Sequence, residues 1–223
     1  MLVDQFARTA RTPRTRVKRL PKRGHYDRET VHAVLDAGVI CHVGYVIDGQ
    51  PYVTPTCHWR HGDRLYWHGS SASRMLRHLK QGVPACVTVT HLDGFVLARS
   101  GFHHSVNYRS VMALGHARLV PDEAKIEALE GFVARLFPGR WDKLRPPTRQ
   151  EIKATTVVWM DLDEVSAKIR TGPPVDDEED YALPVWAGVL PITLHVGMPE
   201  PDVRLAANVP APSYLAEPLF MRR

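Results

Sequence analysis

The 223-residue sequence predicts a mainly β fold, an antiparallel barrel with helices inserted at its edges. Six or seven short β-type segments follow one another with hairpin-type turns between them, and helical periodicity appears only in the gaps. Neither a GxGxxG motif after a predicted strand nor a GxxxxGK[ST] motif occurs in the sequence. Their absence argues against the parallel sheets of Rossmann and P-loop proteins.

The first half of the sequence predicts one helix followed by a run of hairpin-connected strands. Asp27 is a candidate N-cap, and apolar residues at helical spacing follow it as far as Gly38, which favours helix termination. Asp48-Gly49 lies between two β-rich segments and is the strongest hairpin signal in the chain. The expected elements are a helix over about 28–37, strands over 39–47, 51–60 and 65–68, and a short helix from Met75 to Gly82.

The second half predicts further strands and two more helices. Pro121 suits the first turn of a helix, and apolar residues recur at helical spacing from Ile126 to Leu136. Thr148 and Glu151 have the spacing of a capping box, which predicts a short helix directly after Thr148. The expected strands cover 85–90, 95–99, 110–120 and 155–162.

Positive charge is concentrated at the N-terminus. Residues 1–23 carry eight Lys or Arg against Asp4, which leaves 21 basic and 23 acidic residues in the remainder. Such a segment could bind nucleic acid, an acidic membrane surface or an acidic protein partner. Its single aromatic residue, Phe6, and the lack of a known reading motif argue against nucleic acid. We expect a basic arm over 1–23, one barrel domain over 24–193 and an extended proline-rich tail over 194–223.

Cysteine content and hydropathy predict a protein of the reducing cytoplasm. Cys41, Cys57 and Cys86 are odd in number and form no CxxC pair, which argues against a disulfide framework or a zinc ribbon. We expect them to behave as small buried apolar side chains. The longest apolar runs, such as Val39–Ile47, are too short to span a bilayer, so we expect no membrane-spanning segment.

The segment from His68 to Arg74 is the sharpest local signal for ligand binding. A predicted strand ends here, small residues turn the chain, and a helix begins. N–H groups at a helix start are unpaired and lie at the positive end of the helix dipole. Serine hydroxyls and one arginine add donors for an anion. An ordinary serine N-cap followed by a surface arginine has the same pattern, so a phosphate site and a purely structural turn both stay open.

A second polar segment, Leu97 to Val111, carries Arg, Ser, His, Asn and Tyr between two predicted strands. Its His103-His104 pair could suggest a metal. Adjacent residues of a strand point to opposite faces, however, and no HxxxH pattern or carboxylate triad accompanies the pair. We therefore expect no metal site.

A third segment, Pro51 to Thr56, has a proline in the middle of a predicted strand. Pro55 has no N–H to donate, so one side of this segment should face something other than a strand. A planar ligand that contacts the backbone would fit this requirement, and so would the free edge of a sheet.

These three segments, in this order, resemble the pyridoxamine 5′-phosphate oxidase-like family of FMN-binding proteins. The resemblance is strongest to its flavin-nucleotide-binding branch, which includes relatives of nitroimidazole-resistance reductases, and it covers about residues 12–193. The sequence features that carry it are Arg14-Thr15-Arg16-Val17 with Arg19, Pro51 to Pro55, the turn from His68 to Arg74, Leu97 to Val111, and Val185 to Pro191.

The resemblance implies a split β-barrel homodimer with FMN, or FAD in its place, at the dimer interface. Met75 stands where many relatives have a lysine, and Arg77 or Lys80 could compensate. The implied cofactor contacts are Val53, Thr54, Pro55 and Thr56 along the isoalloxazine; His68, Gly69, Ser70, Ser73 and Arg74 at the ribityl and phosphate end; Tyr108, Arg109 and Ser110 on the next strands; and Trp186 closing over the ring from either subunit.

The resemblance also implies a flavin-dependent oxidoreductase that transfers two electrons between small molecules. The vitamin-forming oxidase uses an Arg-x-His pattern to bind its substrate's phosphate, but His195 has no arginine two residues earlier, which argues against pyridoxine phosphate as substrate. His58, His103, His104 and Arg99 are candidates for proton transfer. The alternatives are a flavin-binding or storage protein without turnover, and a haem-binding relative on the same barrel in which a histidine would ligate iron.

Overall fold

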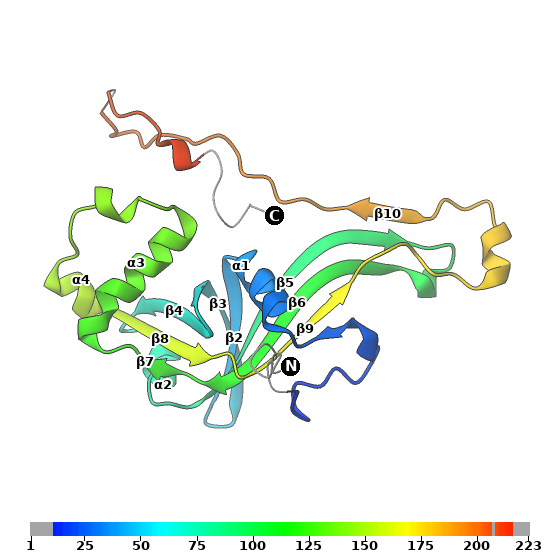
Figure 1. The fold of residues 1–223 in the computed structure, drawn as a ribbon, viewed down its shortest axis with the longest axis horizontal. Helices are drawn as coiled ribbons and strands as arrows, with labels where there is room; N and C mark the ends of the chain where they lie inside the picture. The colour runs from blue at the N-terminus through cyan, green and yellow to red at the C-terminus, as the bar shows by residue number, and fades with distance from the viewer. Residues whose placement is uncertain (1–10, 207, 216–223) are drawn as a thin grey trace, which may run out of the picture.

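The computed structural model describes residues 11–206 and 208–215 and has a mainly antiparallel β architecture with a few short helices (Figure 1). The predicted fold class, mainly β with inserted helices, is confirmed. None of the helices in the described residues is both long and apolar enough to cross a membrane.

Ten strands and ten helical segments make up the described part of the chain. The strands are β1 (Gly24–His25), β2 (Ile40–Ile47), β3 (Gln50–His61), β4 (Arg64–Ser70), β5 (Pro84–Leu97), β6 (Ser105–His116), β7 (Arg118–Leu119), β8 (Thr155–Asp161), β9 (Glu164–Arg170) and β10 (Gly188–Pro191). The α-helices are α1 (Arg28–Asp36), α2 (Arg74–Leu79), α3 (Lys125–Leu136) and α4 (Arg149–Ala154). The 3₁₀ helices are η1 (Pro21–Arg23), η2 (Gly101–His103), η3 (Asp122–Ala124), η4 (Trp141–Lys143), η5 (Glu178–Ala182) and η6 (Ser213–Leu215).

The strands form one antiparallel sheet in the order β1-β9-β6-β5-β2-β3-β4-β8-β7, and β10 pairs with β5 outside this path. Only Ala117 separates β6 from β7, and β7 pairs with β8. The chain itself therefore joins the two ends of the path β6-β5-β2-β3-β4-β8, which curls the sheet into a barrel. The β5–β6 hairpin continues beyond the barrel and carries β10 along its far end (Figure 1).

The main core lies inside this barrel. Cys41 and Val43 on β2 and Leu65 and Trp67 on β4 are buried, whereas Ile40, next to Cys41, is exposed, because successive residues of a strand point to opposite faces. The helices α1 and α2 cover the barrel and add to the same core the side chains of Val31, Val34, Leu35, Met75, Leu76 and Leu79.

A second apolar cluster lies on the outside of the barrel, where α3 packs against the sheet. Trp59 on β3 is 2% exposed and packs with Val157 on β8 and with Phe132 and Leu129 of α3. Lys125 is the single buried residue of α3, so the apolar side chains of this helix are only partly covered.

Several local signals in the sequence are confirmed by backbone geometry. Asp27 caps the first helix with its side chain. Asp48 and Gly49 both have positive φ angles, 50° and 79°, as a tight hairpin turn requires. Thr148 and Glu151 form the expected capping box, with the Thr148 N–H donating to Glu151 Oε2 at 2.7 Å and the Glu151 N–H donating to Thr148 Oγ1 at 3.2 Å.

One long strand replaces two expected short ones. The strands expected over 85–90 and 95–99 form the continuous β5, and a register shift between Leu92 and Gly94 takes the place of a turn. A Cβ atom at Gly94 would lie 2.9 Å from the carbonyl oxygen of Leu190, so glycine at this position lets β10 approach β5 closely.

The strand β9 is absent from the expected elements. Val165, Ala167 and Ile169 do alternate with polar residues, which is the pattern of a half-buried strand. The turn at 162–163 that separates β9 from β8 contains no Gly or Pro, so the sequence lacks the turn-forming residues that usually indicate a hairpin.

The C-terminal residues of the described chain run away from the barrel. Residues 193–206 are exposed, and the chain returns to the body where Arg140 donates a hydrogen bond to the Tyr214 hydroxyl at 3.0 Å (Figure 1). The expected domain boundaries at 23/24 and 193/194 stay a prediction.

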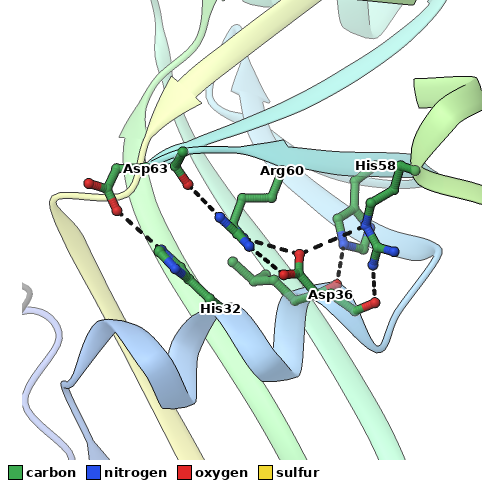
Figure 2. A network of polar contacts seen from close by, with 8 residues as sticks. His32, Asp36, His58, Arg60 and Asp63 are labelled. Atoms are coloured by element: carbon green, nitrogen blue, oxygen red, sulfur yellow. Dashed lines mark hydrogen bonds and ion pairs between the residues drawn. The ribbon is translucent and has the colours of Figure 1, made fainter. Parts of the chain in front are cut away.

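A polar network fastens the C-terminal end of α1 to three other elements (Figure 2). Asp36, the last residue of α1, accepts hydrogen bonds from Arg60 on β3, one of them at 3.1 Å from Nε, and its backbone carbonyl accepts one from Arg135 on α3. His32, one turn earlier, contacts Asp63 at 3.1 Å. The two arginines offset the unfavourable position of a carboxylate at the negative end of a helix dipole.

His58 lies at the centre of the same region and is 2% exposed. Its Nε2 lies 3.0 Å from the carbonyl oxygen of Leu35 in α1 (Figure 2). Burial lowers the pKa of His58 to about 4, so the imidazole is neutral at pH 7 in the folded protein.

This buried histidine predicts that the protein loses stability in mild acid. The unfolded chain binds a proton on His58 near pH 6.5 and the folded protein only near pH 4, so stability is complete above pH 6.5 and falls as the pH is lowered towards 4. Between pH 7 and pH 5 this one group should remove about 2 kcal/mol from the free energy of unfolding. Urea unfolding at both pH values should show a smaller loss for His58→Gln than for the wild type. The exposed His61→Gln is the control, and equal losses in all three proteins would contradict the assignment.

Candidate functional site

The turn between β4 and α2 forms the expected helix start. Ser73 is the N-cap of α2 and accepts a hydrogen bond from the Leu76 N–H at 3.5 Å, while the Ser70 hydroxyl accepts one from the Ala72 N–H at 3.2 Å. Both hydroxyls keep their own hydrogen for donation to a ligand. A Cβ atom at Gly69 would lie 3.1 Å from the Leu76 side chain, so the glycine lets α2 pack against the strand.

The Arg74 side chain lies over an aromatic ring rather than beside a carboxylate. Its guanidinium carbon is 4.1 Å from the centre of the Tyr52 ring. Tyr45 stacks on the other tyrosine at 5.6 Å between ring centres and contacts the Thr54 hydroxyl at 3.1 Å. No ion pair holds Arg74 within the described residues. The turn and the β2–β3 hairpin therefore hold a cation without a carboxylate partner in the described chain against the Tyr52 ring, on the same turn as the Ser70 and Ser73 hydroxyls.

The two tyrosines were not among the expected site residues. Tyr45 and Tyr52 are direct partners across the β2–β3 ladder, because each lies three residues from the Asp48-Gly49 turn. Once Asp48-Gly49 is taken as a two-residue turn, counting outwards from it pairs these two residues, and this is the signal that could have found them.

The segment Pro51 to Thr56 divides its side chains between the two faces of β3. Thr54 and Thr56 point to the same side as Tyr52 and are partly buried, and the Thr56 hydroxyl donates to the His68 carbonyl at 3.5 Å. Val53 is 68% exposed on the opposite, outer face, and Pro55 is exposed beside it. One flat ligand can therefore meet the side chains of only one of these two sets.

The expectation that Pro55 lacks a strand neighbour on one side is confirmed. The ladder with β2 covers residues 50–57 of β3, but the ladder with β4 begins only at His58. The second backbone edge of this stretch is consequently free of strand pairing within the described residues, as a proline in a strand requires.

His68 lies in a different environment from Arg74. Its imidazole packs 4.8 Å from the Phe132 ring of α3 and 5.7 Å from Trp59, between the helix and the outer face of the sheet. Its Nδ1 is buried without a hydrogen-bond partner among the described residues. Burial lowers the pKa of His68, so the ring is neutral at pH 7. Only the backbone of His68 adjoins the turn, through Gly69.

Tyr108, Arg109 and Ser110 follow one another on β6 and have separate surroundings. The Arg109 guanidinium makes two hydrogen bonds to Asp93, at 3.0 and 2.9 Å, and this contact raises the pKa of the arginine. Tyr108 pairs with Leu92 on β5. Ser110 lies on the sheet face that lines a cavity.

This cavity has a volume of about 370 Å³ and lies between the N-terminal segment and the sheet. Its lining is strongly cationic and rich in hydroxyl groups. The lining residues are Arg14, Thr15, Arg16, Val17, Lys18, Arg19, Thr88, Thr90, Ser110, Val111, Met112, Ser166 and Lys168.

Trp186 lies at the far end of the β5–β6 hairpin. It is 68% exposed, and its ring lies within about 3.0 Å of the position that a Cβ atom of Gly188 would occupy. Gly188 pairs with Leu97 near the tip of the hairpin, and Figure 1 places β10 far from α2. The described chain does not bring Trp186 to the turn at Arg74.

The candidates for proton transfer are dispersed. His58 is enclosed in the structural network described above, which removes it from contact with any ligand on the surface. Arg99 pairs with Asp176 at 2.9 Å, and His103 lies 3.3 Å from Asp177. His104 contacts the Ser100 carbonyl at 2.9 Å in the same distal region.

The sequence matches a family model. The model described as pyridoxamine 5′-phosphate oxidase covers residues 27–169. These residues include the whole barrel from β2 to β8, the turn at Arg74 and almost all of β9. A search of curated protein sequences found no match.

Solved structures extend the similarity over most of the chain. The flavocytochrome Anf3 from Azotobacter vinelandii is 50% identical, with 93% of this chain and 97% of that chain covered at a TM-score of 0.89. A protein from Mycobacterium smegmatis, described as binding FAD and haem, is 38% identical, with 88% and 98% covered at a TM-score of 0.85. A candidate 5-nitroimidazole antibiotic resistance protein from Bacteroides thetaiotaomicron is 20% identical, covers 66% and 86%, and has a TM-score of 0.53, which supports the fold alone.

The family model covers more than half of the chain, and the two most similar of these structures share its fold over most of its length. The expected resemblance and the split β-barrel fold are confirmed. The chain belongs to the pyridoxamine 5′-phosphate oxidase family.

Proposed function

We propose that this protein binds FMN, with FAD as the alternative, and acts as a flavin-dependent oxidoreductase on a small molecule. The observation that carries the proposal is the unpaired Arg74 guanidinium, fixed over the Tyr52 ring at a helix start. Two similar proteins support the proposal: the flavocytochrome and the FAD- and haem-binding protein named above match this chain over most of their length.

The residues at the turn fit the phosphate of a flavin nucleotide. Arg74 supplies two or more N–H donors in a planar arrangement that suits phosphate oxygens. The Ser70 and Ser73 hydroxyls can each donate a hydrogen, whereas the Leu76 N–H of the same turn is already bonded to Ser73. Met75 is buried in the core, so a lysine at this position would not lie in the open beside Arg74.

The free backbone edge of β3, which the Thr56 hydroxyl joins to the turn through the His68 carbonyl, and the outer face beside it fit an isoalloxazine ring and a second copy of the chain. Ile40, Val46 and Val53 are large apolar side chains that are exposed along this face. Exposed apolar patches on a folded protein usually mark an interface. We propose that a second subunit covers them, that the flavin lies in this interface, and that Trp186 of that subunit closes over the ring.

The chain's own residues would bind, orient and shield the cofactor. When bound, the flavin supplies two-electron transfer, which the protein's side chains cannot perform. Arg74 and the serine hydroxyls hold the phosphate, the backbone and exposed side chains of β3 orient the ring, and the partner subunit excludes water. A flavin carrier without turnover would use the same contacts. Reduction of the bound flavin by NADH or NADPH without air separates the two, because a pure carrier stays oxidised.

A second candidate function, haem binding, is favoured by the surroundings of His68. The imidazole is neutral at pH 7, which is the form that ligates iron, and its Nδ1 has no protein partner in the described chain. The aromatic rings of Trp59 and Phe132 flank it, and the apolar side chains of α3 above it are only partly covered. We propose His68 as the residue that would hold a haem between α3 and the sheet.

The cysteines support the cytoplasm as the site of action. Cys41, Cys57 and Cys86 are free thiols, and burial raises the pKa of Cys41 to about 12. Free thiols without disulfide bonds are typical of proteins that fold and work in a reducing compartment.

Replacing Arg74 tests the phosphate site. Arg74→Ala should weaken FMN binding by about 1.5–3 kcal/mol, or roughly tenfold to a hundredfold in Kd, because a charge-assisted hydrogen bond is lost. Quenching of flavin fluorescence during titration of the apoprotein measures this change. Lys153→Ala is the matched control, since it removes one exposed positive charge from the neighbouring helix α4. An unchanged Kd for Arg74→Ala, or an equal loss in both variants, would reject the assignment.

Replacing His68 tests the haem site separately. Haem added to the wild type should give a Soret band that is shifted from free haem, and His68→Ala should lose that shift while still binding FMN. His61→Ala, which removes an exposed imidazole from the end of β3, should behave like the wild type. The haem proposal fails if His68→Ala and the wild type give the same spectrum, or if neither takes up haem.

A further inference from the structure

The cavity of about 370 Å³ has a floor made by three strands of the sheet. Thr90 on β5, Ser110 on β6 and Lys168 on β9 are direct partners across the two ladders, so their side chains form one row on one face. Thr88 and Ser166 lie in the next row, two residues along their strands. Regular pairing therefore fixes the positions of these five polar side chains relative to one another.

The wall of the cavity is the segment 14–19, which is held firmly in place. Thr15 within it is buried. The Val17 N–H donates to the Tyr26 hydroxyl at 2.8 Å, and Arg14 pairs with Glu164 on β9. The basic segment is therefore packed against the sheet over these residues instead of extending into solvent.

The charge of the cavity is not balanced by the protein. Arg16, Lys18, Arg19 and Lys168 line it and have no carboxylate partner among the described residues, and no carboxylate is part of the lining. Four neighbouring cations without counter-ions repel one another, so an anion bound between them would relieve an unfavourable interaction.

Hydroxyl groups add directed donors to this charge. The side chains of Thr88, Thr90 and Ser166 have no hydrogen-bond partner within the part of the chain that is described, although Ser166 is buried. Ser110 donates to the Lys168 carbonyl at 3.2 Å. Free hydroxyls beside cations are the donor set that proteins use for phosphate oxygens.

From these observations we infer that the cavity is a second anion site, which binds the phosphate or diphosphate group of a small molecule. Its volume is that of a small-molecule pocket rather than of a groove for a polymer. It is separate from the turn at Arg74, because Tyr52 and Thr54, which accompany Arg74, point to the opposite face of the sheet.

The cavity and the proposed ring site share the outer face. Thr88 pairs with His42, and His42 pairs with Pro55, so the cavity floor is two strands from the exposed Val53 and Pro55. If the proposed flavin site is correct, the phosphate-bearing molecule in the cavity would lie next to the ring. Two molecules could supply such a group: a nicotinamide dinucleotide that donates electrons, or FAD, whose single diphosphate would then lie in the cavity and not at Arg74.

Calorimetric titration of the full-length protein with inorganic pyrophosphate and with ADP tests the site without any flavin. The wild type should bind both, and Lys168→Gln and Arg16→Gln should each weaken binding about tenfold, the loss expected from one charge-assisted contact. Lys22→Ala is the control, because it removes one charge from the same basic segment but does not line the cavity. Melting temperatures show whether each variant is folded.

No binding of either probe by the wild type would overturn the inference, and so would an equal loss in Lys22→Ala, which would indicate general attraction to a basic segment. Two titrations then show which molecule supplies the phosphate group: FMN and FAD are added to the apoprotein, and NADPH is added to the FMN-loaded protein. Lys168→Gln weakens FAD but not FMN if the cavity holds the FAD diphosphate, and weakens NADPH alone if it holds a separate nucleotide. If the flavin proposal is wrong, Arg74→Ala leaves the Kd of FMN unchanged. The pyrophosphate titration does not depend on that result, so the two proposals can fail separately.

Discussion

The alternation of side chains across one curled antiparallel sheet is the constraint on which the rest of the structure depends. Within the barrel, alternate residues of β2, β4, β5, β6 and β9 enter the core, which leaves the residues between them on the outer face. Part of that face is covered by α3, part by the segment 14–19, and part is exposed apolar surface. The proposed ring site, the cavity and the proposed dimer interface all lie on this remaining outer surface.

The same sheet keeps two kinds of histidine apart. His58 is locked against the end of α1 and contributes to stability while it is neutral. His68, one strand away, is also neutral but has no hydrogen-bond partner for Nδ1 in the described residues. A buried polar atom without a partner costs stability. Ligation of the iron of a haem bound between α3 and the sheet would explain why a histidine occupies this position.

The sequence predicted the turns and helix caps, because these depend on residues close together in the chain. It did not predict the features that depend on contacts between distant residues. Asp48-Gly49, Asp27 and the Thr148–Glu151 pair fix turns and caps within four residues, and each was predictable. The sequence could not show that Arg109 is held by Asp93, that the His68 ring turns towards Phe132, or that residues 14–19 close a cavity over β9. Those contacts depend on strand register and on packing between segments up to about 150 residues apart.

The central claim is that this barrel holds one flavin nucleotide per chain, with its phosphate at Arg74. The most direct measurement is the visible absorption spectrum of the purified protein, followed by denaturation and quantification of the released cofactor. The account predicts flavin bands and about one FMN or FAD for each chain, in the protein as purified or after incubation with excess flavin. A protein that stays colourless and takes up neither FMN nor FAD would contradict it.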